Sequence, residues 1–399
     1  MVKKILLLGG SAQQVVAIDT AKKMGYYTIL CDYLRDNPGQ YHADKFYLVS
    51  TTNKEEVLNV AKQENVDGIL AYASDPAAPT AAYVAEKMDL PTNPYRSVYI
   101  LCNKDRFRTF LKKNGFNTPQ AKSYIDKQSA LSERGKFSLP VIVKPVDSSG
   151  SKGVTVLYDW KRYSEALDYA FSFSRSSHII VEEYVEKKHP YIIGGDIFIT
   201  NGKINLWGLL NCHRDNSVNP LVPVGKSFPL ALEKEDIRRV KETITNLMSA
   251  LHIKFGSVNV ELIIDKQNRV WPIDIGPRAG GNMIPDLLGM IFEVDVIKMA
   301  ILAAMGEKTS ISISEGLPFM ATHNLHSNRD GIYKGIRFEE RLNNYIIKKC
   351  IYKRSGDRIR RFNNASDALG IIFLKFPNEK EMYDVLQNIN KYIIVDIEE

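Results

Sequence analysis

Several features that mark common protein classes are missing from this chain of 399 residues. None of its four cysteines, which are Cys31, Cys102, Cys212 and Cys350, belongs to a CxxC pair or to a spacing typical of a metal site. We therefore expect reduced, buried thiols in a reducing compartment. No apolar stretch of the sequence approaches the roughly 20 residues that cross a bilayer. This predicts a cytoplasmic protein without a membrane partner.

Basic residues are not gathered in any long run, although the formal net charge is +7. Proteins that bind nucleic acid usually carry a basic stripe, so we do not expect a nucleic acid partner. Hydrophobic residues make up 44% and charged residues 25% of the chain, as in ordinary globular proteins. The length predicts two to three domains. The apolar run near the start is too short for a signal peptide, and we expect it to form the first strand.

Two glycine patterns fall short of known nucleotide motifs. The turn in "LLLGGSAQQ" lacks the spacing of GxGxxG, although Asp32 ends the second strand where a ribose-binding acid would lie. In "PVGKSF" the first glycine of a phosphate loop would fall at Pro220, so that motif fails. An NAD-dependent oxidoreductase remains an alternative, which predicts binding of pyridine nucleotides and no hydrolysis of ATP.

The order of the expected elements divides the chain into three parts. Buried strands alternate with amphipathic helices over residues 1–95, which predicts an open α/β domain with a doubly wound parallel sheet. Residues 96–310 read as an α+β block with two antiparallel hairpins, one of them turning at Asn201-Gly202. Residues 311–399 read as a small α+β segment of short strands and one helix.

A loop of small residues, 147–153, follows the strand "PVIVKP". Such a loop can place backbone N–H groups and hydroxyls around phosphate oxygens, because no bulky side chain holds them away. Lys144 on the preceding strand would add a positive charge for the same phosphates. A plain hairpin turn beside a half-buried lysine is the alternative interpretation.

The hairpin "SVNVELIIDKQNRVWPIDI" carries two acids on one face. With a turn at residues 265–268, Glu261 pairs with Pro272 and Asn259 with Asp274. Strand alternation then places Glu261 and Asp274 on the same side, as diagonal neighbours roughly 7–8 Å apart. Two carboxylates without a facing cation suit Mg²⁺, which prefers oxygen ligands. Arg278, just past the strand, would suit a phosphate or carboxylate. A solvated sheet face with two ordinary acids remains the alternative.

Together these stretches resemble the ATP-grasp superfamily over roughly residues 1–310. The family's parts come in order: an open α/β domain, Lys104 at the head of a helix, Lys144, the small-residue loop, a hinge strand near 182–186, and the hairpin with two acids. The hairpin ends in a motif similar to the family's acidic-x-Asn-Pro-Arg. The stretch "IGPRAGGN" resembles the subgroup related to carbamoyl phosphate synthetase and carboxylate–amine ligases. The resemblance implies an ATP-grasp domain over residues 96–310.

The resemblance also implies roles for individual residues. Lys104 and Lys144 would touch the phosphates of ATP. Ser148, Ser149, Gly150 and Ser151 would form the lid over them. Glu182, Glu183 and Val185 would line the adenine pocket. Glu261 and Asp274 would hold Mg²⁺, with two ions expected and Mn²⁺ a possible substitute. Arg278 and Lys144 would be the catalytic residues, with Arg278 steadying the transferred phosphoryl group.

This sequence departs from the family pattern at two places. The metal-binding asparagine of the motif is replaced by Gly276, and Asn259 or Asn282 are the candidates to substitute for it. The acid that usually binds the ribose has no clear match. The candidates for that role are Glu186, His189 and Asp196.

The resemblance implies a ligase that joins a small-molecule carboxylate to an amine or thiol through an acyl phosphate, converting ATP to ADP and phosphate. His213, Arg214 and Lys226, in an apparent loop, are candidates to meet a substrate. Gly280, Gly281 and Asn282 would leave room for it. A homodimer is expected by analogy. A bicarbonate-activating carboxylase or carbamoyl-phosphate-forming enzyme and a non-catalytic nucleotide sensor remain alternatives.

Overall fold

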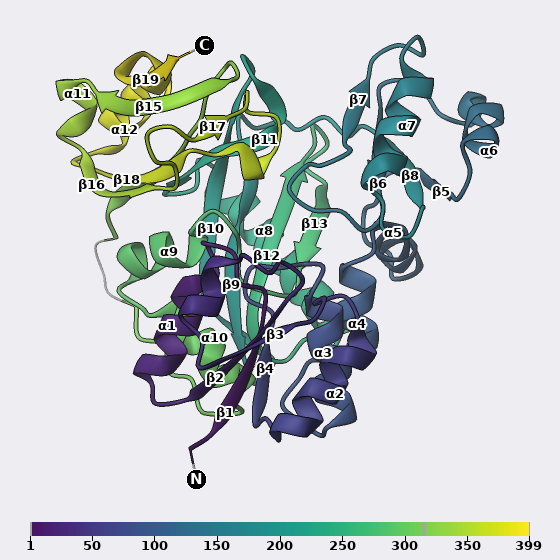
Figure 1. The fold of residues 1–399 in the computed structure, drawn as a ribbon. Helices are drawn as coiled ribbons and strands as arrows, with labels where there is room; N and C mark the ends of the chain where they lie inside the picture. The colour runs from purple at the N-terminus through teal and green to yellow at the C-terminus, as the bar shows by residue number, and fades with distance from the viewer. Residues whose placement is uncertain (1, 314–316, 399) are drawn as a thin grey trace.

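The computed structural model describes residues 2–313 and 317–398 (Figure 1). The N-terminal part holds a sheet of four parallel strands in the order β3-β2-β1-β4. Its elements are β1 (Lys4–Leu8), α1 (Val15–Lys23), β2 (Tyr27–Asp32), β3 (Lys45–Leu48), α2 (Lys54–Glu64), β4 (Gly68–Leu70) and α3 (Ala78–Lys87). The predicted parallel α/β arrangement is therefore present, and β3 is a strand that the sequence pattern did not reveal.

Both faces of this sheet are covered by helices. Leu6 and Leu8 of β1 pack on the side of α2 and α3. Ile5 and Leu7 pack on the other side against α1 and against α10 (Val296–Ala304), a helix from far along the chain. The near-continuous apolar run of β1 reflects this double burial. Packing of α10 ties the N-terminal sheet to the rest of the molecule.

A second sheet belongs to a unit that lies apart from the main body in Figure 1. Its four strands are antiparallel, in the order β5-β8-β6-β7. The elements of this region are α4 (Tyr95–Leu101), α5 (Lys104–Lys113), β5 (Ala121–Tyr124), α6 (Lys127–Ser132), β6 (Val141–Pro145), β7 (Thr155–Leu157), α7 (Tyr163–Phe173) and β8 (Ile179–Glu183). The helices α4 and α5 are separated by Cys102 and Asn103.

The largest sheet has eight strands in the order β13-β12-β9-β10-β11-β14-β18-β16. Its elements and neighbours up to residue 292 are β9 (Ile192–Thr200), β10 (Lys203–Asp215), β11 (Asn219–Phe228), α8 (Lys234–Ala250), β12 (Gly256–Ile264), β13 (Val270–Gly276) and α9 (Ile284–Phe292). Asn201 and Gly202 have φ of 52° and 76° and join β9 to β10. This is the tight hairpin turn predicted from the Asn-Gly pair.

The C-terminal segment continues this sheet through β14, β18 and β16. Its elements are β14 (Phe319–Leu325), β15 (Gly331–Phe338), α11 (Glu340–Asn343), β16 (Ile346–Ile351), β17 (Arg358–Ile359), β18 (Gly370–Phe376), α12 (Glu379–Leu386) and β19 (Ile393–Glu398). β17, β15 and β19 form a separate small sheet. The domain limits at 95 and 310 and the hinge near 182–186 stay predictions. Of the helices in the described ranges, none combines the length and the apolar character needed to span a bilayer.

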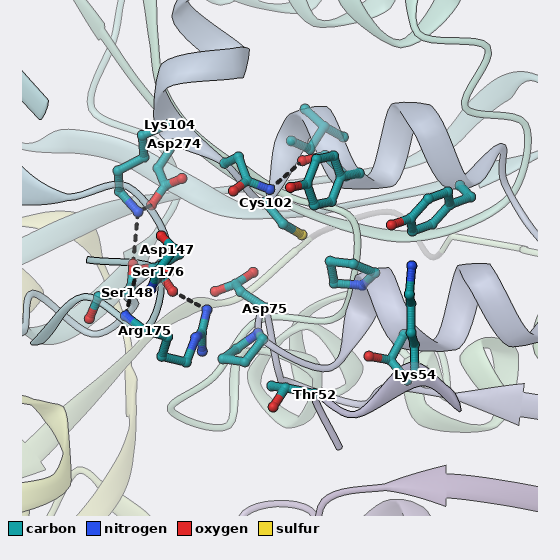
Figure 2. A pocket seen from close by; sticks show the side chains of 17 residues that line it. Thr52, Lys54, Asp75, Cys102, Lys104, Asp147, Ser148, Arg175, Ser176 and Asp274 are labelled. Atoms are coloured by element: carbon teal, nitrogen blue, oxygen red, sulfur yellow. Dashed lines mark hydrogen bonds and ion pairs between the residues drawn. The ribbon is translucent and has the colours of Figure 1, made fainter. Parts of the chain in front are cut away.

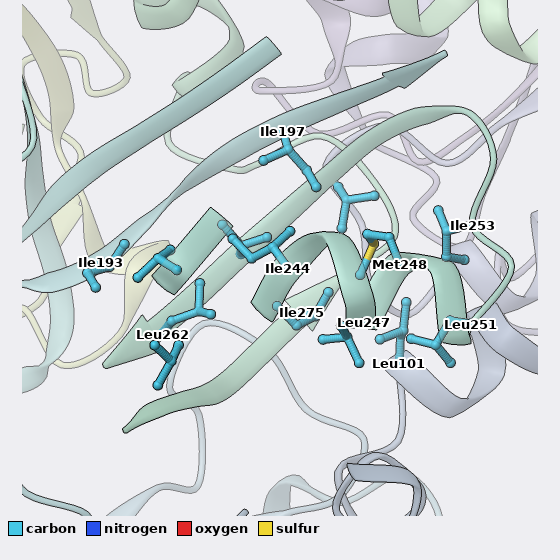
Figure 3. Packing of buried hydrophobic residues seen from close by; sticks show 14 of the residues in the cluster. Leu101, Ile193, Ile197, Ile244, Leu247, Met248, Leu251, Ile253, Leu262 and Ile275 are labelled. Carbon is cyan, nitrogen blue, oxygen red and sulfur yellow. The ribbon is translucent and has the colours of Figure 1, made fainter. Parts of the chain in front are cut away.

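The core beneath the central sheet holds the β12–β13 hairpin in place. Val260 and Leu262 of β12 and Ile275 of β13 pack there against α8 (Figure 3). Val270 joins this core, whereas Trp271 donates its Nε1–H to Asp265. Because one face of the hairpin is fixed by apolar packing, the polar residues of the other face are held at defined positions.

Candidate active site

The β12–β13 hairpin places Glu261 directly opposite Asp274. The predicted pairing of Glu261 with Pro272 and of Asn259 with Asp274 is wrong, since Asn259 lies opposite Gly276. The two acids are therefore closer than the diagonal neighbours expected from the sequence. Facing positions on adjacent strands lie about 4.5–5.5 Å apart.

Two irregularities account for the changed register. The turn is one residue wider than predicted, because the N–H of Asp265 donates to the carbonyl of Arg269 and Ile264 pairs with Val270. The Asp265 carboxylate closes this wider turn by accepting from the N–H of Arg269 at 2.9 Å. A bulge next to Glu261 shifts the register once more.

A cavity of about 520 Å³ lies over this polar face. It gathers many of the residues singled out from the sequence, namely Ser149, Gly150, Ser151, Arg214, Lys226, Glu261, Asp274, Arg278, Gly281 and Asn282. Lys104 and Ser148 line a neighbouring cavity, to which Asp274 also contributes. Lys144, Glu182, Glu183, Val185, Asp196, His213 and Gly280 line neither of these two cavities. The functional roles of all these residues remain proposals.

Lys144 and Glu182 form a buried ion pair with a third partner, Arg108. The Lys144 ammonium lies 2.8 Å from one Glu182 oxygen, and the Arg108 guanidinium donates to both oxygens at 3.0 and 3.2 Å. Burial lowers the pKa of Lys144 to about 8, although Glu182 opposes the shift. Burial would raise the pKa of Glu182, but Arg108 and Lys144 hold it at about 2. Glu182, predicted to line the adenine pocket, thus has its carboxylate committed to positioning Lys144.

We expect nucleotide binding to weaken above pH 8 because Lys144 loses its proton there. The charged form binds phosphate, so the Kd for a non-hydrolysable ATP analogue should rise by up to about tenfold between pH 7 and pH 9. Lys144→Met should weaken binding at pH 7 and remove this pH dependence. Isothermal titration calorimetry at several pH values measures both effects. An unchanged Kd for the variant at pH 7 would contradict the role of Lys144.

The small-residue loop, residues 147–153, contacts α5 on one side and β11 on the other. Lys104 at the head of α5 donates to the carbonyl of Ser148 at 2.8 Å and approaches Asp274 to 4.0 Å (Figure 2). On the other side, the Ser151 hydroxyl donates to the carbonyl of Leu221 in β11 at 2.9 Å. Gly150 and Ser151 have φ of 68° and 60°, so the loop turns tightly over the cavity.

Arg278 forms an ion pair with an acid that the sequence did not point to. Its guanidinium donates to both carboxylate oxygens of Asp75, with Nε at 2.7 Å from the first. Asp75 follows β4 in the N-terminal sheet, 203 residues away, and lines both cavities. Both residues are largely buried, with side chains 13% and 23% exposed. Paired in this way, Arg278 is fixed at the edge of the site.

Comparison with known proteins identifies the family. A model of the ATP-grasp domain matches residues 137–286, which hold β6, the small-residue loop, β8 and the hairpin with the two acids. The chain belongs to the ATP-grasp superfamily.

Two curated relatives and one solved structure show how far the similarity extends. The formate-dependent phosphoribosylglycinamide formyltransferase of Prochlorococcus marinus is 33% identical over 189 residues, covering 46% of this chain and 48% of that protein. The carbamoyl phosphate synthase large chain of Clostridium botulinum is 26% identical over 306 residues, 74% of this chain and 27% of that one. Phosphoribosylglycinamide synthetase from Anaerococcus prevotii shares the fold, with a TM-score of 0.77, 22% identity and complete coverage of both chains.

The ATP-grasp motif normally has asparagine at the position of Gly276, and the structure explains the glycine. A Cβ atom there would lie 2.5 Å from a carboxylate oxygen of Asp75 and 3.1 Å from the Arg278 guanidinium carbon. Any side chain at position 276 would therefore displace the Asp75–Arg278 ion pair. Asp75, which follows a strand of the N-terminal sheet, occupies the space that a side chain at position 276 would need.

We expect Gly276→Ala to lower kcat/KM by about tenfold, because Asp75 must move away from Arg278. The Asp75→Ala variant removes the clash, and a double-mutant cycle tests this. The combined variant should be no worse than Asp75→Ala alone. Losses that multiply in the combined variant would show that Gly276 matters for some other reason.

Asp196 and the amide nitrogen of Asn259 bind each other, and Asn259 also lines the cavity. Asp196 is 1% exposed and accepts from the backbone N–H of Gly280 at 2.7 Å and from the Asn259 amide at 2.8 Å. Burial raises its pKa, although these hydrogen bonds oppose the shift. These contacts argue against Asp196 as the ribose-binding acid. Asn282 lines the cavity, and its N–H donates to Gln13 of the N-terminal domain.

The two glycine patterns judged incomplete have structural roles in this ATP-grasp protein. Asp32 accepts from the N–H groups of Gly10 and Leu34, so it supports the first turn instead of pointing outward. Gln14 fills the space beside that turn and would collide with a Cβ at Gly9. These contacts argue against the dinucleotide alternative. The GKS triplet lies in β11 and is part of a strand.

Proposed function

We propose that this protein is an ATP-dependent ligase that joins a carboxylate to an amine or thiol through an acyl phosphate. The observation that carries the proposal is the facing pair Glu261 and Asp274, set in one cavity with Arg278 and the small-residue loop. A carboxylate is a poor acyl donor because its leaving group would be oxide. Phosphorylation supplies a better leaving group.

The facing acids fit a divalent cation. Glu261 and Asp274 are 26% and 47% exposed, so their oxygens are accessible. Among the described residues, their cationic neighbours are Arg214 at 3.8 Å from Glu261 and Lys104 at 4.0 Å from Asp274, which is too far for a strong ion pair. Oxygen ligands of this kind suit Mg²⁺, and Mn²⁺ would fit the same donors. Bound there, the metal would neutralise phosphate charge, and two ions are our expectation.

The proposed reaction has two steps. A carboxylate oxygen of the acid substrate attacks the γ-phosphorus of ATP, and the bond to ADP breaks. The amine or thiol then attacks the carbonyl carbon, phosphate leaves, and the nucleophile loses a proton. Lys144 and Lys104 would hold the nucleotide phosphates, and Arg278 would steady the transferred group. The loop tied down by Ser151 would exclude water, which otherwise hydrolyses an acyl phosphate.

A bicarbonate-activating enzyme remains the second candidate. The relatives include a carbamoyl phosphate synthase large chain, of which this chain covers 27%. Such an enzyme would begin with the same phosphorylation, using bicarbonate as the acid. A homodimer and Glu183 and Val185 as adenine contacts also remain proposals.

A screen for ADP release across pairs of carboxylates and amines tests the proposal. We expect ADP only when a matching acid is present, and a new amide in equal amount when the amine is added. Bicarbonate as the sole effective acid would favour the second candidate. ATP binding without ADP release in any combination, bicarbonate included, would favour a nucleotide sensor.

A further inference from the structure

Two cations from neighbouring strands reach the cavity. Arg214 at the end of β10 and Lys226 in β11 both line it. The sequence pattern predicted a loop for these residues and for His213, and this is wrong, because β10 extends to Asp215 and pairs with β11. The polar residues that face the cavity interrupt the apolar pattern of these strands. That interruption hid the strands from pattern analysis.

Lys226 is a buried cation whose ammonium contacts a thiol. It is 4% exposed, and its ammonium donates to the Cys212 sulfur at 2.6 Å. A thiol is only a weak acceptor. No ion pair of Lys226 occurs within residues 2–313 and 317–398. Burying a charge in this way is costly unless an anion joins it.

The space around the Lys226 ammonium is kept free by glycine. A Cβ at Gly194 of β9 would lie 2.3 Å from the Cys212 sulfur and 3.1 Å from the Lys226 nitrogen. The nearby acid Asp196 interacts electrostatically with Lys226, but its oxygens accept hydrogen bonds from Gly280 and Asn259 and not from the ammonium. In the described part of the chain, no carboxylate is in direct contact with the Lys226 ammonium.

Arg214 is paired only loosely, through a long ion pair with Glu261. Its Nε–H is buried without a hydrogen-bond partner, and its closest acid is Glu261 at 3.8 Å. Under the proposed function, Glu261 is shared with a metal. His213 next to it adds no negative charge. Burial, with Lys226 and Arg214 contributing, lowers its pKa to about 4, so the ring is neutral near pH 7.

The same cavity also holds a neutral hydrogen-bond donor that has no acceptor within the described ranges. Tyr352, which follows β16, lines the cavity, and its hydroxyl is buried without a hydrogen-bond partner. Burial raises the pKa of the phenol, so it keeps its proton. One wall therefore offers the Lys226 ammonium and the Arg214 guanidinium, and the same cavity has an unused hydroxyl. An anionic group would satisfy donors of this kind.

We propose that Arg214 and Lys226 form an anion subsite for a second negatively charged group of the acid substrate, separate from the carboxylate that is activated. The inference rests on the proposed ligase function and narrows its substrate class to dicarboxylates or phosphorylated carboxylates. The nucleotide phosphates have other partners in Lys104, Lys144 and the loop. Arg278, which is paired with Asp75, is assigned to the transferred phosphoryl group in the proposed function. The two cations on β10 and β11 are thus left for the substrate.

Calorimetry with defined acids tests the subsite. The protein is titrated, with Mg²⁺ and a non-hydrolysable ATP analogue present, with acetate, succinate and phosphonoacetate. The last two carry a second anionic group. We expect one of them to bind at least tenfold more tightly than acetate. Lys226→Met should remove that preference and leave the affinities for acetate and for the ATP analogue unchanged.

Two further variants keep the result interpretable. Lys226→Arg retains the charge and should retain the preference, which guards against a folding defect in Lys226→Met. Lys375→Met removes one charge from an exposed position of β18 and should change nothing. Equal affinities for all three acids in the unaltered protein would overturn the subsite. So would a persistent preference in Lys226→Met, or a loss of ATP analogue affinity in that variant.

The ligase proposal and the anion subsite would be contradicted by different experimental results. If no acid, bicarbonate included, releases ADP while the Lys226-dependent preference for diacids persists, the ligase proposal is wrong and the anion subsite stands. If ADP release occurs with acids carrying one negative charge as readily as with two, the subsite is wrong and the ligase stands.

Discussion

Replacing Arg278 by alanine is expected to lower substrate-dependent ADP release by roughly 100- to 1,000-fold, the usual loss when one group that stabilises a transition state is removed. The guanidinium is largely buried and is held in a fixed position by Asp75, so the variant removes a preorganised charge from the site. The loss should fall mainly on kcat, because the charge acts on the transferred phosphoryl group. Steady-state kinetics with a coupled ADP assay measures it.

The fold should survive this change. Asp75 is partly exposed and can be solvated once its partner is gone. Arg238→Ala on the exposed face of α8 is a matched control, since it removes an arginine that pairs with Glu235 and Glu242 outside the site. That variant should turn over normally. Full activity in Arg278→Ala would remove its catalytic role.

The second large effect concerns stability, through the buried carboxylate of Glu182. Glu182→Gln leaves Lys144 and Arg108 buried without a negative charge, and breaking a buried pair in this way costs about 3–5 kcal/mol. The free energy of unfolding should fall by that amount in chemical denaturation. Binding of an ATP analogue should weaken as well, because Lys144 loses the partner that orients it.

Glu183→Gln is the matched control for this experiment. Glu183 is the next residue of the same strand and is exposed, so the same chemical change should cost less than about 0.5 kcal/mol. If Glu182→Gln unfolded with the free energy of the unaltered protein, the triad would not stabilise the fold. If it were less stable but bound nucleotide normally, Glu182 would support the fold without positioning Lys144.

Local sequence patterns were sufficient to predict the secondary structure that depends on residues close together in the chain. The parallel N-terminal strands, the Asn201-Gly202 turn and the helix beginning at Lys104 follow from apolar periodicity and turn chemistry. The two acids on one hairpin face follow from strand alternation. Their register did not, because the Asp265 side chain widens the turn and a bulge shifts the pairing. Neither device leaves a clear trace in the apolar pattern.

Contacts between distant segments could not be read in this way. Asp75 meets Arg278 across 203 residues, and Arg108 meets Glu182 across 74. Both acids and bases are common residue types, so nothing in a single sequence marks them as partners. The sheet strands that carry Arg214 and Lys226 were missed because polar side chains facing a cavity resemble loop composition. The sequence alone could not predict which of its many charged side chains lie close together in the fold.

The contact between Asp75 and the space at Gly276 has a consequence for building hybrid proteins. The acid comes from the N-terminal sheet and the glycine from the hairpin of the ATP-grasp domain. Replacing the N-terminal part by one without an acid at position 75 would leave Arg278 without this partner. Grafting a relative's asparagine-bearing hairpin beneath this N-terminal part would produce a collision. A hybrid protein therefore has to keep the residues at positions 75 and 276 matched.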